Sequence, residues 1–300
     1  MTGGSSRENR AAGGSGGSLS GADVVLLRSP GRAGPMTREL RSRGARVHLM
    51  PLIDFQRPAD TEPVSAGLRR LGAGDFTWII FTSATTVGAL SLAAEDLGGT
   101  LPGLCSGTRV AAVGKGTARA LEAAGISTDL LPGADQSARG LAAAWPASED
   151  GANRVFLPQA NIADPFLRTA LAASGWDVCT VAAYETVDYP APEDRRISAE
   201  PEGDQELLSP SRYRAGAAFP HAVVVTSPST ARRFVRDALV PGTAVLAAIG
   251  DPTAAELRGL GHPAAATAEH PTPAGIARAV EAALATIDFP HPDPEGREQP

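Results

Sequence analysis

Two 13-residue segments of this chain share one pattern, in which a short apolar run is followed by a glycine turn, a threonine and a helical continuation that ends in glycine. The first, VGKGTARALEAAG, runs from Val113 to Gly125, and the second, IGDPTAAELRGLG, runs from Ile249 to Gly261. Glycine permits tight turns, threonine commonly caps a helix, and glycine commonly ends one. Each segment therefore predicts a strand end, a turn and a helix, and their alignment without a gap indicates an internally duplicated chain.

Two further pairs of segments repeat in the same order. FTSATTVGAL, which begins at Phe81, resembles VTSPSTARRFV, which begins at Val225, and residues 24–53 resemble residues 154–184. Strands that alternate with helices predict the α/β class, with a parallel sheet in each half. The order of the repeats fits a tandem pair of domains and one domain inserted in the other equally well.

The length of 300 residues is sufficient for two such domains. Residues 1–21 are rich in Gly and Ser and have little apolar surface to bury, so we expect a disordered tail. Proline and charge dominate residues 190–220, which predicts a mobile insertion, and residues 289–300 predict a loose tail. If one domain interrupts the other, the polar breaks after Phe55 and Asp188 are the natural crossover points.

Composition disfavours several classes of protein. The net charge of −6 opposes a general binder of nucleic acid or anionic membrane, which needs an excess of Lys and Arg. Cys105 and Cys179 are too few for a disulfide framework, and with no signal-peptide pattern or long apolar run they favour a cytoplasmic protein. The histidines lack metal-ligand spacing, and neither a phosphate loop nor a GxSxG elbow is present. Lys115 is the single lysine, which with abundant Ala, Gly and Pro suggests a GC-rich bacterial genome.

Four predicted strand ends lead through Ser, Thr, Gly or Pro into a helix start, at Thr82–Ser83, Gly116–Thr117, Thr226–Ser227 and Pro252–Thr253. A helix start presents free N–H groups and a partial positive charge, which favour anions. In parallel sheets such positions lie at the carboxyl ends of the strands, where ligands bind. Plain helix capping explains any single one of them equally well, because Ser and Thr are the ordinary cap residues. If the two domains face one cleft, four such helix starts are harder to attribute to capping alone, and a site for an anionic ligand is expected there.

Gly114 and Gly116 also match the beginning of the dinucleotide-binding fingerprint GxGxxG. Arg119 occupies the place of its third glycine, where close packing of helix on strand leaves no room for a side chain, and the second repeat keeps only Gly250. A dinucleotide-dependent oxidoreductase is therefore one alternative function, which cofactor titration would test. A non-enzymatic two-domain sensor of small molecules is another.

Six segments, in this order and spacing, resemble the uroporphyrinogen-III synthase family over roughly Val24 to Ala285. They are FTSATTVGAL, VGKGTARALEAAG, AAYETV, VTSPSTARRFV, AAIGDPTAAELRGLG and AEHPTPAGIARAV. The resemblance implies two similar parallel-sheet α/β domains, the second inserted in the first and joined by a two-strand ladder. It assigns residues 22–54 and 188–288 to the first domain and residues 55–187 to the second.

The resemblance also implies an activity, a cofactor and a set of partners. Members of the family are lyases that cyclise hydroxymethylbilane, with inversion of its last ring and loss of water, to uroporphyrinogen III for the synthesis of haem, sirohaem and cobalamin. Neither a metal nor an organic cofactor is implied. Loss of the hydroxyl leaves an electrophile that closes by itself to the wrong isomer, so the protein must chiefly fold and steer its substrate. We expect a cytoplasmic monomer that binds this small molecule, with no nucleic acid or membrane, and that transiently contacts the enzyme supplying it.

Individual site residues follow from the same resemblance. Tyr184, in AAYETV, matches the family's tyrosine that assists departure of the hydroxyl, and a phenol is a protonated donor at neutral pH. The many carboxylates of the substrate suit helix starts and nearby cations. Among the substrate contacts we prefer Thr117, with Thr253 as its counterpart, whereas Asp251 would repel a carboxylate. The expected substrate-binding residues are Arg28, Thr82, Ser83, Gly114, Lys115, Thr117, Thr226, Ser227, Ser229 and Thr253.

Overall fold

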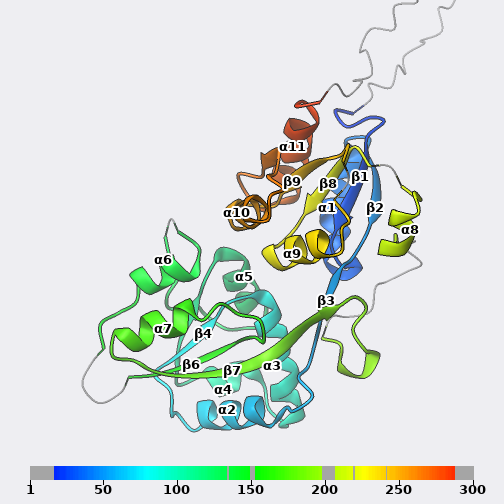
Figure 1. Ribbon diagram of the computed structural model, residues 1–300. Coiled ribbons are helices and arrows are strands. Elements are labelled where there is room, and N and C mark those ends of the chain that lie inside the picture. The colour runs from blue at the N-terminus through cyan, green and yellow to red at the C-terminus, as the bar shows by residue number, and fades with distance from the viewer. Residues whose placement is uncertain are drawn as a thin grey trace, which may run out of the picture. The chain divides into compact units, whose positions relative to one another are not determined.

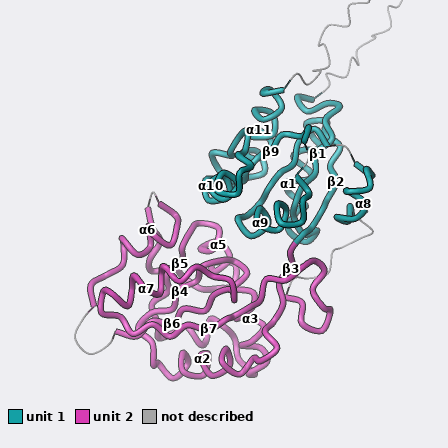
Figure 2. The backbone as a smooth tube through the Cα atoms, in the orientation of Figure 1, with its two compact units in different colours: residues 1–52, 201–300 teal, residues 53–200 magenta. Residues whose placement is uncertain are grey.

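The chain divides into two compact units, each a mixed α/β unit with its own sheet (Figure 2). The computed structural model describes residues 17–133, 135–148, 153–197, 207–218, 220–240 and 242–287. Unit 1 consists of Met1–Leu52 and Pro201–Pro300, and unit 2 consists of Ile53–Glu200. Unit 2 is therefore inserted in unit 1, and the α/β class that the repeats predict is confirmed.

Unit 1 has a parallel sheet of five strands in the order β10-β9-β8-β1-β2. Helices α1 and α11 cover one face of this sheet, where Leu26, Leu40, Val224 and Val280 belong to one buried cluster (Figure 1). The strands are β1 (Asp23–Leu27), β2 (Arg46–Leu49), β8 (Ala222–Val225), β9 (Val245–Ala248) and β10 (Ala266–Thr267). The helices are α1 (Pro30–Ser42), α8 (Pro210–Arg214), α9 (Pro228–Arg236), α10 (Asp251–Gly259) and α11 (Pro273–Leu284).

Unit 2 has a five-stranded sheet in the order β3-β7-β6-β4-β5, parallel except for the edge strand β3. Successive residues of β4 enter different clusters, Ile79 and Phe81 on one face and Trp78 and Ile80 on the other, so both faces of the sheet are buried. The strands are β3 (Ile53–Gln56), β4 (Trp78–Phe81), β5 (Arg109–Ala112), β6 (Arg154–Ala160) and β7 (Asp177–Asp188). The helices are α2 (Glu62–Gly72), α3 (Ala84–Asp96), α4 (Leu101–Cys105), α5 (Lys115–Ala123), α6 (Ala138–Ala143), α7 (Phe166–Ala173) and the 3-10 turn η1 (Glu193–Arg195).

The two-strand ladder that we expected is formed by β3 and β7. The two strands pair antiparallel from Ile53 with Asp188 to Gln56 with Glu185. The expected domain limits, at 54/55 and 187/188, fall inside this ladder, whereas the compact units change at 52/53 and 200/201. The reason for the difference is that β7 is one continuous strand, so β3 and the whole of β7 belong to the sheet of unit 2.

The segments that we expected to be disordered are ordered where the structure describes them. Leu19 is fully buried in the core of unit 1, and its N–H donates to the Arg43 carbonyl at 2.8 Å. Within the expected insertion, the Ile197 N–H donates to the Phe55 carbonyl at 3.0 Å, and the Leu208 N–H donates to the Leu49 carbonyl at 2.8 Å. The remaining parts of these expectations, at 1–16, 198–206, 219 and 289–300, lie outside the described residues. Within the described residues, no helix is long and apolar enough to cross a membrane.

Candidate functional site

In unit 2, Ser83 lies two residues after the end of β4 and caps helix α3. Its Oγ accepts the Thr86 N–H at 3.1 Å and lies 3.0 Å from Thr86 Oγ1 and 3.1 Å from the Tyr184 hydroxyl. A serine hydroxyl has one donor and two acceptor positions, so these three neighbours use its hydrogen-bonding capacity. Thr82 precedes Ser83 and is partly exposed. The sequence thus placed the helix start correctly, but the Ser83 side chain serves Thr86 and Tyr184.

Tyr184 comes from the far end of β7 and is 6% exposed. Its ring contacts Phe55 edge to face, with ring centroids 5.5 Å apart, and belongs to the same buried cluster as Phe81. Its hydroxyl, held beside Ser83, lies at the carboxyl end of β4, the edge of the sheet where ligands of parallel-sheet proteins bind. The structure therefore brings together the predicted catalytic tyrosine and one predicted contact residue.

A β-bulge in β7 directs the Tyr184 ring to this place. The parallel register of β6 and β7 pairs Gln159 with Ala182 and then Ala160 with Tyr184, so Ala183 is an extra residue. A shift by one residue reverses the side-chain faces of a strand. Ala183 and Tyr184 consequently enter the same buried cluster although they are consecutive. Sequence reasoning missed the bulge, because the pair Ala182–Ala183 before Tyr184 does not distinguish it from a regular strand.

In unit 1, Ser227 follows β8 and caps α9 in the same way. Its Oγ accepts the Thr230 N–H at 3.1 Å and lies 2.8 Å from Thr230 Oγ1. The third neighbour here is the Ser229 Oγ, at 3.0 Å, from the same helix. Thr226 donates its hydroxyl to the Leu27 carbonyl at 2.6 Å. Each of these predicted contact residues therefore already has a partner within unit 1.

The glycine turns follow the neighbouring strands, as the repeats predict. Gly114 caps α5 beside the end of β4, because the Val113 N–H donates to the Phe81 carbonyl at 3.1 Å. The Lys115 N–H donates to Gln136 Oε1 at 3.0 Å, and the Lys115 side chain is exposed. Gly250 caps α10 in the corresponding place of unit 1, where the exposed Asp251 takes the position of Lys115.

The structure lowers the support for direct contacts from Thr117 and Thr253. Thr117 is 7% exposed and Thr253 is 2% exposed, so both side chains lie within their own units. Their N–H groups donate to Gly114 and Gly250 carbonyls respectively, each at 3.0 Å. This burial favours a role in packing the first helical turn over the hydroxyl contact that we preferred from the sequence.

Arg28 is the predicted contact residue with the most unusual electrostatics. It follows β1, is partly buried, and donates its Nε–H to the Arg32 carbonyl at 2.9 Å. Burial, together with the nearby positive charge of Arg32, lowers the pKa of Arg28 to about 10. No ion pair joins Arg28 to a carboxylate of the described residues. A partly buried cation without such a partner is a favourable position for an anionic ligand.

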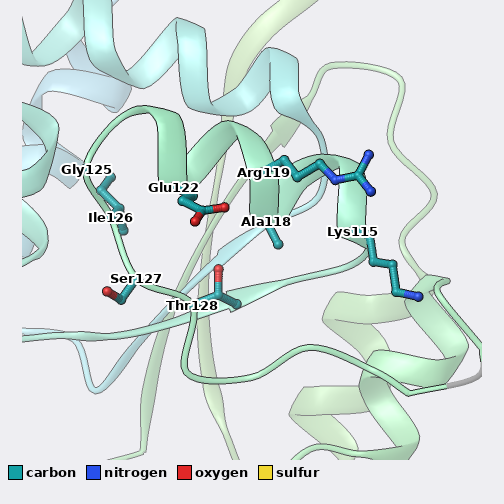
Figure 3. A pocket seen from close by; sticks show the side chains of 8 residues that line it. All are labelled: Lys115, Ala118, Arg119, Glu122, Gly125, Ile126, Ser127 and Thr128. Carbon is teal, nitrogen blue, oxygen red and sulfur yellow. The ribbon is translucent and has the colours of Figure 1, made fainter. Parts of the chain in front are cut away.

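A groove of about 580 Å³ runs along α5 and the segment that follows it. It is lined by Lys115, Arg119 and Glu122 from the helix and by Gly125–Thr128 beyond it (Figure 3). Arg119 extends toward the end of α5 that carries Lys115 (Figure 3). Two cations thus lie near one helix start in unit 2. Among the residues with described positions, no group of three or more His, Cys, Asp and Glu could hold a metal ion.

Comparisons with known proteins agree with one another. Residues 34–278 match the family described as uroporphyrinogen-III synthase HemD. A uroporphyrinogen-III synthase of Synechococcus elongatus is 29% identical over 171 residues, which make up 56% of this chain and 62% of that relative. The chain thus spans less than two thirds of the length of that curated relative.

Two solved structures share the fold. A mutant uroporphyrinogen III synthase of the extremely thermophilic bacterium Thermus thermophilus superposes with a TM-score of 0.62 at 19% identity, covering 89% of this chain and 100% of that chain. Uroporphyrinogen-III synthetase from Helicobacter pylori gives a TM-score of 0.50 at 18% identity, with 89% and 100% covered. These likenesses confirm the two-domain α/β fold.

Proposed function

Because the chain belongs to the uroporphyrinogen-III synthase family, we propose that it is a lyase that cyclises hydroxymethylbilane, a linear tetrapyrrole, to uroporphyrinogen III. The last ring is inverted during closure. One water leaves for each molecule closed, and the reaction consumes no oxidant or reductant. The observation that carries the proposal beyond family membership is the hydrogen bond of 3.1 Å between Tyr184 and Ser83 at the carboxyl edge of unit 2.

In the proposed mechanism, Tyr184 assists departure of the substrate hydroxyl. A phenol beside a leaving oxygen donates a hydrogen bond or a proton, so the oxygen departs as water rather than as hydroxide. The ring is fixed by Phe55 and by its burial, which limits the geometries that its hydroxyl can adopt. Either hydroxyl of the pair Ser83–Tyr184 can be the donor. If the phenol donates to Ser83, that hydrogen bond breaks when the phenol donates to the substrate instead.

After the hydroxyl has left, the substrate is an electrophile that closes without help to the type I isomer. The protein must therefore hold the last ring so that its substituted carbon attacks first, through a spiro intermediate, before the ring is inverted. We assign this steering to groups that bind the carboxylates of the substrate. The candidate groups are the Arg28 guanidinium, Lys115 and the helix starts that follow Ser83, Gly114, Ser227 and Gly250.

The charge of Arg28 supports this assignment in unit 1. Its guanidinium is partly buried, and burial lowers its pKa to about 10. A carboxylate placed against it offsets the desolvation of the cation, and a charge-assisted hydrogen bond of this kind contributes about 1.5–3 kcal/mol. The overall negative charge of the chain does not oppose such binding, since the field around a site is local.

The decisive experiment supplies freshly made hydroxymethylbilane to the purified protein and measures the ratio of type III to type I uroporphyrinogen. We expect type III to dominate with protein and type I to dominate without it. A folded sample that yields only type I product would refute the proposed function.

We extend the proposal to a cytoplasmic monomer that receives its substrate from the enzyme that makes it. The support is chemical, since an unstable substrate that closes by itself is best passed on quickly. Sedimentation of the protein alone tests the monomer, and sedimentation with the supplying enzyme tests the contact.

A further inference from the structure

We propose that Asn161 is a positioning residue for Tyr184, acting through the backbone of β7. This inference rests on the proposed function only for its effect on catalysis, because its structural part concerns where the Tyr184 ring is held. Asn161 is exposed and follows the last residue of β6, at the point where that strand ends beside Tyr184.

Asn161 makes two hydrogen bonds to β7. Its backbone N–H donates to the Tyr184 carbonyl at 3.0 Å, and its side-chain Oδ1 accepts the Thr186 N–H at 3.0 Å. In a regular parallel ladder, one residue donates its N–H to one residue of the neighbouring strand and accepts, at its own carbonyl, the N–H two residues further on. Here the amide side chain of Asn161 takes the place of its own backbone carbonyl.

This substitution has a structural reason. The chain leaves the sheet after Ala160, and the Ala163 N–H donates to the Ala160 carbonyl in the turn that follows. Asn161 therefore lies beyond the last residue of β6, and its side chain, rather than its backbone carbonyl, accepts the Thr186 N–H. Asn is well suited to this position because its short side chain bonds backbone groups near turns.

The residues that Asn161 holds are those that the bulge displaces. The extra residue Ala183 reverses the side-chain faces of β7, and Asn161 is bonded immediately after it, at Tyr184 and Thr186. On its other edge, this part of β7 pairs with β3, where Phe55 lies opposite Thr186. Without the Oδ1 acceptor, the stretch from Tyr184 to Thr186 is fixed on one edge less firmly, so the phenol has more freedom to leave Ser83.

The test uses 3-fluorotyrosine and fluorine NMR. The chain has three tyrosines, Tyr184, Tyr189 and Tyr213, and the Tyr184→Phe variant identifies the resonance of Tyr184. We expect Asn161→Ala to shift or broaden that resonance and to leave the Tyr213 resonance in place. Asn161→Asp keeps an oxygen acceptor at the same position, so it should restore the wild-type resonance.

Asn153→Ala is the matched control. Asn153 precedes the same strand at its opposite end, and its Oδ1 is buried without a hydrogen-bond partner among the described residues. The control removes the same amide group from the same unit, so it should change neither the Tyr184 resonance nor the turnover rate.

Kinetics then connect position to catalysis. We expect Asn161→Ala to lower kcat for type III product about fivefold, with KM within about twofold of wild type, since a displaced acid loses rate rather than binding. In a Tyr184→Phe background, the same change should cost less than about twofold, because the two residues act through one group.

The inference is overturned if the Tyr184 resonance of Asn161→Ala coincides with that of wild type, or if Asn153→Ala moves it equally. Full additivity of Asn161→Ala and Tyr184→Phe would refute the catalytic part. If the wild-type protein makes no type III product, the proposed function fails, while the resonances still decide whether Asn161 positions Tyr184.

Discussion

The two units use the same serine at the start of the same helix and differ in its third partner. Ser83 and Ser227 each bond the N–H and the hydroxyl of the threonine three residues on. In unit 1 the remaining position goes to Ser229, two residues away, whereas in unit 2 it goes to Tyr184, 101 residues away. An identical cap therefore bonds a residue of its own helix in one unit and Tyr184, the proposed proton donor, in the other.

The difference arises from strand length. In unit 1, β1 stops at Leu27 and β2 has 4 residues. In unit 2, β6 continues to Ala160 and β7 has 12 residues, which carries Tyr184 to the edge. The two units thus share one frame, and the longer strand pair of unit 2 places Tyr184 beside Ser83.

The largest effect that this comparison predicts is the loss of the Tyr184 hydroxyl. Tyr184→Phe should slow formation of type III product at least about tenfold, because a positioned proton donor is removed, with folding intact. Ser229→Ala removes the corresponding third partner in unit 1 and should slow it less than about threefold. Steady-state assays with circular dichroism as a folding control measure both. Equal losses in the two variants would contradict the difference between the units.

The second effect concerns Arg28 of unit 1. Unit 2 has no cation in the corresponding position, because Pro158 is aligned with Arg28 there. Arg28→Met should raise KM about tenfold, equivalent to about 1.4 kcal/mol of binding.

Because burial lowers the pKa of Arg28 to about 10, the charged form is destabilised in the folded state, and its removal should also stabilise the free protein. We expect the free energy of unfolding to rise by about 0.5–2 kcal/mol. Thermal unfolding without substrate tests this gain, and a lower melting temperature would oppose it.

A smaller effect should follow from exchanging the charges at the two glycine turns. Lys115 lies at the positive end of α5, whereas Asp251 lies at the positive end of α10 and partly neutralises it. Lys115→Asp should therefore stabilise its helix by about 0.3–1 kcal/mol and raise KM about threefold, less so at high salt. Asp251→Lys should act in the opposite direction on both quantities. If KM is unchanged in both variants at low ionic strength, neither turn binds a substrate carboxylate.

The smallest effect is expected at Tyr213, a buried tyrosine of unit 1 that we compare with Tyr184 of unit 2. Its hydroxyl is buried and has no hydrogen-bond partner among the described residues, and burial raises its pKa to about 12. Tyr213→Phe should leave turnover unchanged and alter stability by at most about 1 kcal/mol at neutral pH, in the favourable direction. Since the folded pKa exceeds that of an unfolded tyrosine, wild type should lose stability relative to this variant as pH rises from about 10 to 12. Denaturant titrations at neutral pH and above pH 10 check both parts.

Much of the fold could be predicted because it depends on local chemistry that recurs. The serine caps at Ser83 and Ser227 are where the repeats predict them, since cap residues are determined within a few residues. The helix starts expected at Thr117 and Thr253 were wrong, because α5 and α10 are capped three residues earlier, at Gly114 and Gly250. The choice between tandem and inserted domains was not available from the repeats, because both arrangements keep their order.

The details of the site were harder to predict because they depend on register and burial. Only helical spacing signals the burial of Thr117, which lies four residues before the buried Leu121 on the same face of α5. The bulge at Ala183 and the bond from Asn161 to Thr186 depend on how β6 and β7 align over a separation of 25 residues. The hypothesis that Tyr184 is catalytic rests on the family resemblance, and the structure identifies Ser83 and Phe55 as its neighbours.

The closed ends of the inserted unit have a consequence for folding. In unit 1, β1 must pair with β8, and Asp23 bonds His221 across a separation of 198 residues. In unit 2, the Ile197 N–H donates to the Phe55 carbonyl, so the two ends of this unit lie close together. Once unit 2 has folded, the two segments of unit 1 are therefore joined by a short effective loop. At about 5–20 residues per second, the first strand of unit 1 waits roughly 10–40 s on the ribosome for its partner. Early completion of unit 2 therefore shortens the search of β1 for its partner strand.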